Sequence, residues 1–166
     1  MTLAEAAAQG EEFAQSGSER ELADLRAKWA DDLEGAARSA DFRERAVAFR
    51  AIGQFRWRAK EELLRRGLDD ESPACRGSAL LSLELLSRDH PGDVNGMRPL
   101  LHELATNDGN QAVRRLAIMA LRNGTGQRET IQILTALGED DEQDRELREA
   151  AAKVAQVLRK KAGPAK

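Results

Sequence analysis

The sequence predicts an all-α fold built from repeated helix pairs, and two observations support this prediction. Strong helix formers such as Ala, Leu, Glu and Arg dominate the 166 residues, while alternating β-branched runs bounded by turns are absent. One helix pattern, Gly67 to Leu83, also returns at Leu104 to Leu121 and more loosely at Leu137 to Val154. We therefore expect a stack of similar units in one domain, a size that this chain length suits.

Composition narrows the function classes. The chain is 41% hydrophobic but only 4% aromatic, so Leu, Ala, Ile and Val must form most of the core. A net charge of −3, from 26 basic and 29 acidic residues, predicts no general affinity for polyanions. The N-terminus lacks a basic segment followed by an apolar run, and no stretch of about 18 apolar residues occurs. These features predict a cytoplasmic protein with no membrane partner.

The N-terminal third should form three helices. Thr2 to about Gln15 has helix composition with Thr2 as its cap, and Ser18 to Glu21 reads as a capping box that opens a second helix ending near Ser39 or Ala40. Residues 1–40 are thus predicted to be N-terminal capping helices. Asp41 is the expected cap of a third helix, whose inward residues are predicted to be Phe42, Ala48 and Ile52, and which Gly53 weakens.

Turn formers and caps divide the remaining chain. A helix is expected over about Trp57 to Arg66, and Ser72-Pro73 should open the next one. Asp89 to Gly96 should be the longest loop, and Asn107 to Asn110 a turn. Further helices are predicted over residues 97–105, 111–122, 128–137 and about 145–158, with the acidic run 139–144 before the last. Residues 160–166 are expected to be a flexible tail.

Four arginines place the repeats in register: Arg45, Arg76, Arg114 and Arg148, roughly 30–40 residues apart. Small or apolar residues follow them at fixed spacing. Three positions after each arginine come Ala48, Ala79, Ala117 and Ala151, and seven positions after come Ile52, Leu83, Leu121 and Ala155. This spacing places them on one helix face. We therefore predict a right-handed α-solenoid of about four helix pairs, with the repeat array over residues 41–159 continuous with its N-terminal cap.

A helix ending in Leu, an Asp-containing turn, and a second helix that opens with hydrophobe-Arg followed by Ala and Leu resembles the HEAT-repeat family, in particular short bacterial arrays. The resemblance covers roughly residues 30–158, and polar Glu44 departs from it in the first copy. It implies a binding scaffold without common chemistry. It also implies that the turn aspartates pair with the second-helix arginines as follows: Asp69 or Asp70 with Arg76, Asp108 with Arg114, and Asp140 or Asp141 with Arg148.

The sequence carries no clear catalytic pattern. His90 and His102 each lack a second ligand at metal spacing, so solvated or loop-stabilising roles are expected, with no metal and no cofactor. Cys75 occupies a core position and is expected to act as a small hydrophobe. No phosphate-binding loop or nucleophile elbow is present. We therefore predict a protein that is not an enzyme; the HEAT-like alkylpurine DNA glycosylases offer no site that can be transferred to this chain residue by residue.

A basic segment, Arg43 to Lys60, supports an alternative function. It contains one acidic residue, Glu44, and mixes cations with Phe49, Phe55 and Trp57, as a nucleic-acid patch with stacking groups requires. The candidate contacts are Arg43, Arg50, Arg56, Arg58 and Lys60. Core packing of the aromatic residues with a basic rim explains the segment better, so nucleic-acid binding is the second hypothesis.

The first functional hypothesis is a concave protein-binding face formed by the second helices. At roughly 100° per residue, positions one, five and eight after each arginine point away from the core. The chosen candidates are Arg50, Leu81, Glu84, Arg115, Met119, Arg122 and Lys153. A locally basic surface with an apolar centre suits an acidic or amphipathic peptide or helix. We expect a scaffold or adaptor that is a monomer or weak homodimer; an ordinary solvated face is the competing interpretation.

Overall fold

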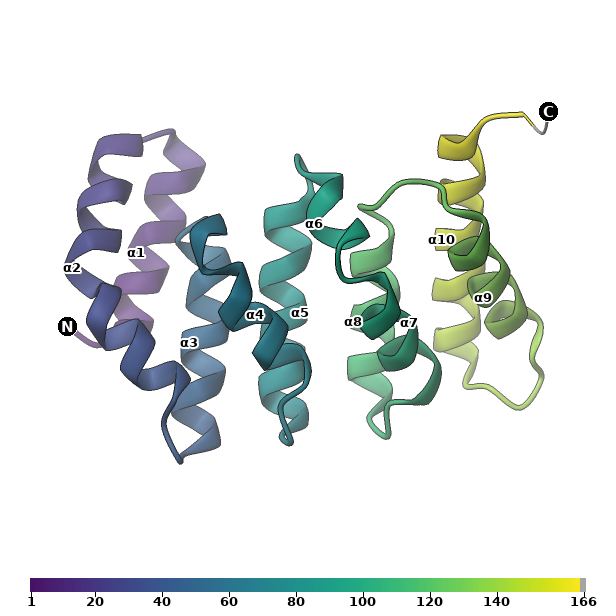
Figure 1. Cartoon of the computed structure of the whole chain (residues 1–166), viewed down its shortest axis with the longest axis horizontal. Helices are drawn as coiled ribbons and strands as arrows, with labels where there is room; N and C mark the ends of the chain where they lie inside the picture. Colours follow the sequence, from purple (N-terminus) through teal and green to yellow (C-terminus); the bar gives the residue numbers. More distant parts are fainter. Residues whose placement is uncertain (165–166) are drawn as a thin grey trace. The chain divides into compact units, whose positions relative to one another are not determined.

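The computed structural model describes residues 1–164, and within them it is all-helical, as predicted (Figure 1). The α-helices are α1 (Leu3–Ser16), α2 (Glu19–Ala37), α3 (Phe42–Gln54), α4 (Glu61–Leu68), α5 (Pro73–Ser87), α6 (Pro91–Asn95), α7 (Arg98–Asn107), α8 (Gln111–Leu121), α9 (Arg128–Glu139) and α10 (Arg145–Ala162), with a 3-10 helix η1 (Arg58–Lys60) before α4. The right-handed stacking and the number of helix pairs stay predictions. Residues 165 and 166 of the predicted tail lie outside the described part, whereas α10 continues past residue 160.

The chain divides into two compact units, residues 1–86 and 87–166. The first combines the predicted capping helices α1 and α2 with the helices up to α5. The second holds α6 to α10. Each unit has its own buried apolar residues, and the predicted core residues Ala79, Leu83, Val113, Leu121 and Leu147 are all buried. The prediction of one domain with boundaries near residues 40 and 159 remains a prediction.

Unit 1 is a two-layer arrangement in which α1, α3 and α5 lie beside one another and α2 and α4 cover them (Figure 1). The predicted Thr2 cap forms a full capping box with Glu5. Gly10 of α1 approaches α3 closely, because a Cβ atom there would meet the buried Phe55 ring at 2.5 Å. Helix α2 is tied to the end of α3 by Arg26, which donates to the carbonyl oxygens of Phe55 and Arg56 at 2.8 and 2.9 Å.

Three local predictions in unit 1 are wrong. Ser18 makes no capping bond to α2; its hydroxyl lies 2.8 Å from that of Ser16, so the expected capping box does not form. Phe42, expected inside, is 46% exposed because it is the first residue of α3, beyond the helices that cover the core. Trp57 does not begin a regular α-helix, because the 3-10 helix η1 follows it and α4 begins only at Glu61. The Trp57 side chain is half-buried. Asp41 does cap α3, accepting from the Arg43 amide at 2.9 Å.

Gly53 and Ser82 explain how α3 and α5 approach each other. The Gly53 amide donates to the Ser82 hydroxyl at 2.9 Å, and that hydroxyl donates to the carbonyls of Phe49 and Arg50. A Cβ atom at Gly53 would meet the Ser82 Cα and Oγ atoms at 2.6 Å. Gly53 is therefore a buried contact point, which corrects its predicted position on the outward face. Buried Ser82 satisfies its polar atom entirely with the backbone of α3.

Unit 2 is built from α7 packed on α8 and α9 packed on α10, with α8 also contacting α10 (Figure 1). Asn110 caps α8 by accepting from the Val113 amide at 3.0 Å. The segment predicted as the longest loop contains the short helix α6 instead. Its last residue, Asn95, accepts from the Thr125 amide at 3.1 Å, so α6 is anchored to the turn that follows α8. Pro91 fits because it is the first residue of α6.

The arginine register is confirmed for burial, whereas the Asp70 carboxylate has a different arginine partner from the predicted one. The alanines three positions after Arg45, Arg76, Arg114 and Arg148 are all buried, and so are the residues seven positions after. The Asp70 carboxylate, however, binds Arg45 through two hydrogen bonds of 2.9 and 3.0 Å, whereas Arg76 donates to the Asp70 carbonyl oxygen at 2.9 Å. Within each unit, then, a turn side chain binds the arginine of the preceding copy.

The remaining arginine pairs follow from local geometry. Arg114 donates to the Ala105 carbonyl and to the Gln143 side chain, both at 2.9 Å. Arg148 does pair with Asp141, at 3.3 Å, as predicted. That contact is exposed and adds little stability. Cys75 is buried as expected, and its thiol donates to the Phe42 carbonyl at 3.2 Å. Burial raises the pKa of the thiol.

Candidate functional site

One candidate partner-binding residue of unit 1, Arg50, lines a hollow of about 310 Å³ on the face formed by α1, α3 and α5. We call it the Arg50 hollow. It is lined by Ala4, Ala46, Val47, Arg50, Gln54 and Ser78. Leu81 lies one turn after Ser78 on α5 and is 40% exposed, as the helix phase predicted. Glu84, one further turn along, is half-buried.

Arg50 is the unusual residue of this hollow. It is half-buried, and its Nη1 atom is shielded from solvent without a hydrogen-bond partner in the described chain. A guanidinium N–H group that leaves water without a new acceptor loses free energy. Val47 lies beside it with its side chain exposed. Arg50 lines the hollow, and the exposed side chains of Val47 and Leu81 lie on α3 and α5 beside it.

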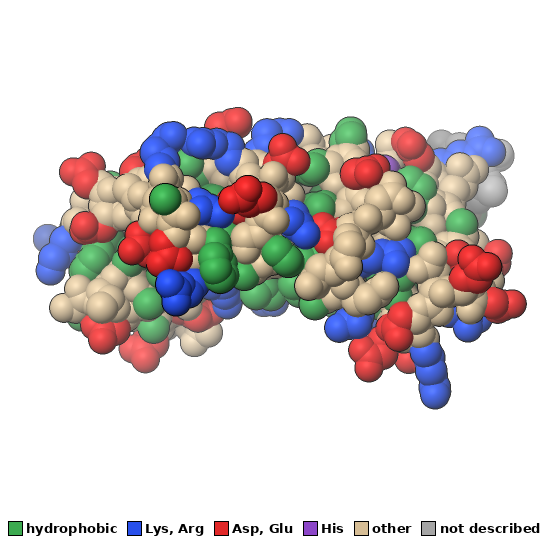
Figure 2. Space-filling model, turned by 90° about the horizontal axis from the view of Figure 1, so that it is seen from below, with side chains coloured by type: hydrophobic (Ala, Val, Ile, Leu, Met, Phe, Trp, Pro, Cys, Tyr) green, Lys and Arg blue, Asp and Glu red, His purple; other side chains and the backbone are tan. Residues whose placement is uncertain are grey.

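The unit 2 candidates are exposed, but one is already engaged. Met119 on α8 is 38% exposed, and Arg122 and Lys153 are exposed as well. Arg115 lies 3.8 Å from Asp144 and 3.4 Å from Glu146, so acidic groups of the same unit neutralise part of its charge. Acidic and basic side chains are also interspersed on the face that Figure 2 presents. No extended patch of one charge is seen there, which favours selective contacts over general electrostatic attraction.

Several cations of the Arg43 to Lys60 segment are held within unit 1. Arg43 lies 3.2 Å from Asp41, Arg58 lies 3.8 Å from Glu61, and Lys60 lies 2.7 Å from Glu34. The hydrogen bond from Lys60 holds the pKa of Glu34 below its usual range. These pairs reduce the positive potential that a phosphate backbone would meet.

The other groups of this segment serve the fold. Arg56 donates to the Gly53 carbonyl at 2.8 Å, which fixes it against the end of α3. Phe49 and Phe55 are buried, so their faces are closed to bases. Trp57 is half-buried, packs edge to face on Phe55, and carries the Lys60 ammonium 5.1 Å from its ring centre. The aromatic residues therefore act as core packing, and no stacking platform is formed by Phe49 and Phe55.

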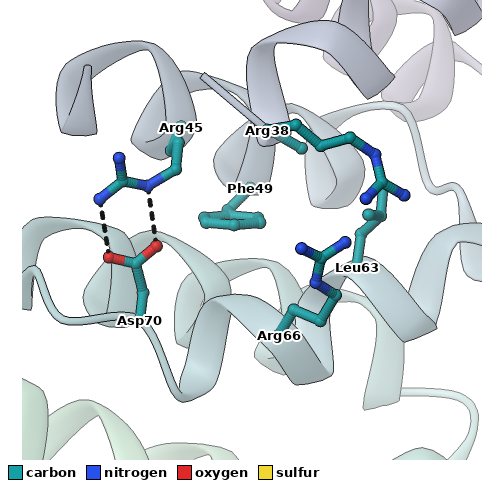
Figure 3. Close-up of a pocket in the computed structure, with 7 residues that line it drawn as sticks. Arg38, Arg45, Phe49, Leu63, Arg66 and Asp70 are labelled. Carbon is teal, nitrogen blue, oxygen red and sulfur yellow. Dashed lines mark hydrogen bonds and ion pairs between the residues drawn. The ribbon is translucent and has the colours of Figure 1, made fainter. Parts of the chain in front are cut away.

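A second cavity on unit 1 escaped the sequence analysis. It measures about 270 Å³ and is lined by Ala37, Arg38, Arg45, Phe49, Leu63, Arg66 and Asp70 (Figure 3). We call it the Phe49 pocket. Its residues come from the end of α2, from α3, from α4 and from the following turn. No local motif signals such a pocket, because only tertiary packing brings Arg38, Arg45 and Arg66 together.

His102 is the main correction in unit 2. The sequence predicted a solvated or loop-stabilising residue, but the side chain is buried and its Nε2 lies 2.8 Å from the Thr130 hydroxyl. Thr130 itself donates to the Gln127 side chain at 2.8 Å, so its oxygen is left to accept a hydrogen bond from His102 Nε2. Burial lowers the pKa of His102. The residue is a buried link between α7 and α9. Its i, i+3 spacing from the apolar residue Ala105 was the available signal in the sequence.

Comparison with known families agrees with the repeat pattern. Residues 94–159 match the family model for HEAT repeats. The match supports a HEAT-repeat assignment for this part of the chain. The match covers the third and fourth arginine copies, and the resemblance of residues 30–93 stays a prediction. A search of curated proteins found no match to the sequence.

The HEAT-repeat assignment bears on function at a general level. HEAT repeats generally serve as scaffolds for protein interactions, and the family is typically non-enzymatic. Within residues 1–164, no helix is both long and apolar enough to cross a membrane.

Proposed function

We propose that the protein is a non-catalytic scaffold that binds an acidic amphipathic helix or peptide at the Arg50 hollow. The family provides the general class. The observation that supports this particular surface is the Arg50 guanidinium, whose Nη1 is shielded and unpaired beside the hollow. A carboxylate of a bound peptide would accept from it in a charge-assisted hydrogen bond, the stronger kind.

The apolar surroundings support an amphipathic partner over a purely acidic one. Ala46 and Val47 line the hollow, and Leu81 is exposed one turn from its edge. An amphipathic helix presents apolar anchors at i, i+3, i+4 and i+7, with acidic groups beside them. Such a helix could bury Val47 and Leu81 while it places one carboxylate against Arg50.

In unit 2 we propose a secondary contact surface made of Arg115, Met119, Arg122 and Lys153. Glu84 belongs to the proposed surface of unit 1, at its edge. Met119 offers the apolar contact, and Arg122 and Lys153 are exposed cations. A partner must compete with Asp144 and Glu146 for Arg115. Substitutions in unit 2 should therefore weaken binding less than substitutions at the Arg50 hollow.

The test uses helical peptides selected from a display library on the full chain. We expect Arg50→Ala and Leu81→Asp each to weaken binding by about tenfold or more, since each removes a central contact. Met119→Asp and Arg115→Glu should have smaller effects. Arg20→Ala is the matched control, because it removes an exposed charge of α2. Selected peptides that bind all four variants like the native chain would contradict the proposal.

Titration with duplex DNA separates the nucleic-acid hypothesis. Phosphate contacts release counterions, so affinity for DNA falls steeply when salt rises from roughly 50 to 200 mM. The proposal predicts a salt dependence for the peptide that is much shallower than such a slope, and no saturable DNA binding at the higher salt. Tight, salt-sensitive DNA binding that Arg43→Ala or Arg58→Ala abolishes would overturn it.

A further inference from the structure

We infer that the Phe49 pocket of unit 1 binds a small oxyanion, a phosphomonoester with a compact apolar group, between Arg38 and Arg66. The pocket lies on the opposite side of α3 from the Arg50 hollow. Positions 45 and 49 face the pocket and positions 46 and 50 face the hollow, as a rotation of roughly 100° per residue requires. The two sites are therefore independent.

The charges of the pocket are unbalanced. Three guanidinium groups line it against the single carboxylate of Asp70. Asp70 is fully occupied by Arg45, through bonds of 2.9 and 3.0 Å, and Arg45 also donates to the carbonyls of Ser39 and Ala40. This closed pair forms one wall, as Figure 3 shows. The positive charge of Arg38 and Arg66 is left for another anion.

Arg66 has no hydrogen bond or ion pair through its side chain to any residue in the described part of the chain. Arg38 has one weak pairing, 3.6 Å from Glu34, in which its own side chain is 57% exposed. Glu34 is bound more closely by Lys60, at 2.7 Å. An exposed pair of this kind contributes little free energy, so Arg38 can turn to a ligand.

The direction of the side chains supports convergence on one ligand. In Figure 3 the guanidinium groups of Arg38 and Arg66 lie on the same side of Phe49, near Leu63. Two like charges on the same side of the pocket repel each other, and an anion between them would offset that repulsion. Planar guanidinium groups fit phosphate oxygens through paired N–H bonds, and two of them match a dianion better than a single carboxylate.

The size and apolar lining limit the ligand. A volume of about 270 Å³ is just below the range of roughly 300–1,000 Å³ typical of sites for drug-sized ligands. Ala37, Phe49 and Leu63 supply apolar surface beside the charges. The pocket thus suits a phosphate group with one small hydrophobic substituent. Such a group occurs both in free metabolites and on phosphorylated side chains of peptides.

The first experiment titrates the full chain with phenyl phosphate and follows backbone amide shifts by NMR. We expect saturable binding with a Kd of about 1 mM or tighter at low salt, with shifts at Arg38, Phe49, Leu63 and Arg66. Arg66→Ala and Arg38→Ala should each weaken binding by about tenfold. Arg65→Ala is the matched control, since it removes a neighbouring charge of α4 that does not line the pocket. Equal binding by the Arg65 and Arg66 variants, or no saturation, would overturn the inference.

Further ligands test the role of the charge and identify the natural source. Benzyl alcohol, which lacks the charge, should not bind, and binding as tight as that of phenyl phosphate would contradict the role of the arginines. A phosphotyrosine peptide that binds at least tenfold tighter than phenyl phosphate would support a phosphorylated protein as the source. Equal affinities would support a small metabolite as the source. In both cases Arg38 and Arg66 would make the same contacts to the phosphate group.

Discussion

The two units use the same repeat arginine in chemically different ways. In unit 1, Arg45 forms a bidentate ion pair with Asp70, and both side chains are largely buried. In unit 2, Arg114 bonds to the neutral Ala105 carbonyl and the neutral Gln143 side chain. The shared feature is therefore a bridge from one helix pair to the turn of the following copy. A charged acceptor in that turn is optional.

The buried polar links of the units differ as well. Unit 1 joins α3 to α5 through Ser82, which carries no titratable group and allows a close approach at Gly53. Unit 2 joins α7 to α9 through His102 and Thr130. The imidazole has a pKa within reach of physiological pH, whereas the hydroxyl does not titrate. The two units should consequently respond differently to overpacking and to acid.

The largest effect is expected from a charge in the unit 2 core. Leu121→Asp places a carboxylate where the native side chain is fully buried, which costs several kcal/mol of a total stability of about 5–15 kcal/mol. Hydrogen exchange should show lost protection in α7 to α10 first. Met119→Asp, two residues earlier on the same helix but exposed, is the control and should retain the native melting temperature within a few degrees. An unchanged melting temperature for Leu121→Asp would show that the helix phase is wrong.

Gly53→Ala tests the close contact of unit 1. Its new Cβ atom would lie 2.6 Å from the Ser82 Cα, which must shift, so we expect a loss of about 1–3 kcal/mol in urea unfolding. Gly35→Ala in α2 is the matched control, since nothing lies within 4 Å of its added Cβ. That variant should be more stable by about 0.5–1 kcal/mol. Equal effects of both substitutions would refute the contact.

Acid should weaken unit 2 before unit 1. Burial lowers the pKa of His102 in the folded protein, so the unfolded chain binds protons more readily. Its contribution is therefore present above the ordinary pKa of 6.5 and is lost as the pH falls below it. For Asp70, burial alone would raise the pKa, but the bonds from Arg45 and the Ser72 amide outweigh it and lower the pKa. That contribution is lost only below the ordinary value of 3.8.

Unfolding followed between pH 7 and 5 should show falling stability in the native chain and a flatter profile for His102→Gln. His90→Gln, which changes an exposed histidine, should retain the native slope. A slope that His102→Gln leaves unchanged would assign the pH dependence to other groups.

The smallest expected change concerns the neutral bridge of unit 2. Gln143→Ala removes one hydrogen bond to Arg114 and one to Asp140, with a loss of about 1 kcal/mol that added salt should hardly change. Asp70→Asn in unit 1 should instead remove the acid-dependent stability below pH 3.8. A strong salt dependence for Gln143→Ala would contradict the distinction between the units.

Local patterns predicted the helices and most of their buried faces. Thr2, Asp41 and Asn110 cap their helices by accepting hydrogen bonds from amides two or three residues later in the sequence. The alanines three positions after each repeat arginine share one buried helix face. Ser18 shows the limit of such rules, because its hydroxyl found another partner in Ser16.

The candidate site was only partly predictable. Helix phase placed Leu81 and Met119 on the surface, yet it could not show that Gly53 packs on Ser82 or that Asp70 binds Arg45. Those contacts join residues 25 or more positions apart, and no local spacing encodes them. The Phe49 pocket and the buried His102 depend on tertiary packing in the same way.

The central claim is that the Arg50 hollow is the partner-binding surface. The most direct measurement maps the amide shifts of the full chain when a selected acidic amphipathic helix is added, in the native protein and in Arg50→Ala. The account predicts shifts centred on residues 46–54 and 78–84, with affinity reduced by about tenfold in Arg50→Ala and partly restored by Arg50→Lys. Shifts centred elsewhere, with Arg50→Ala binding as tightly as the native chain, would contradict it.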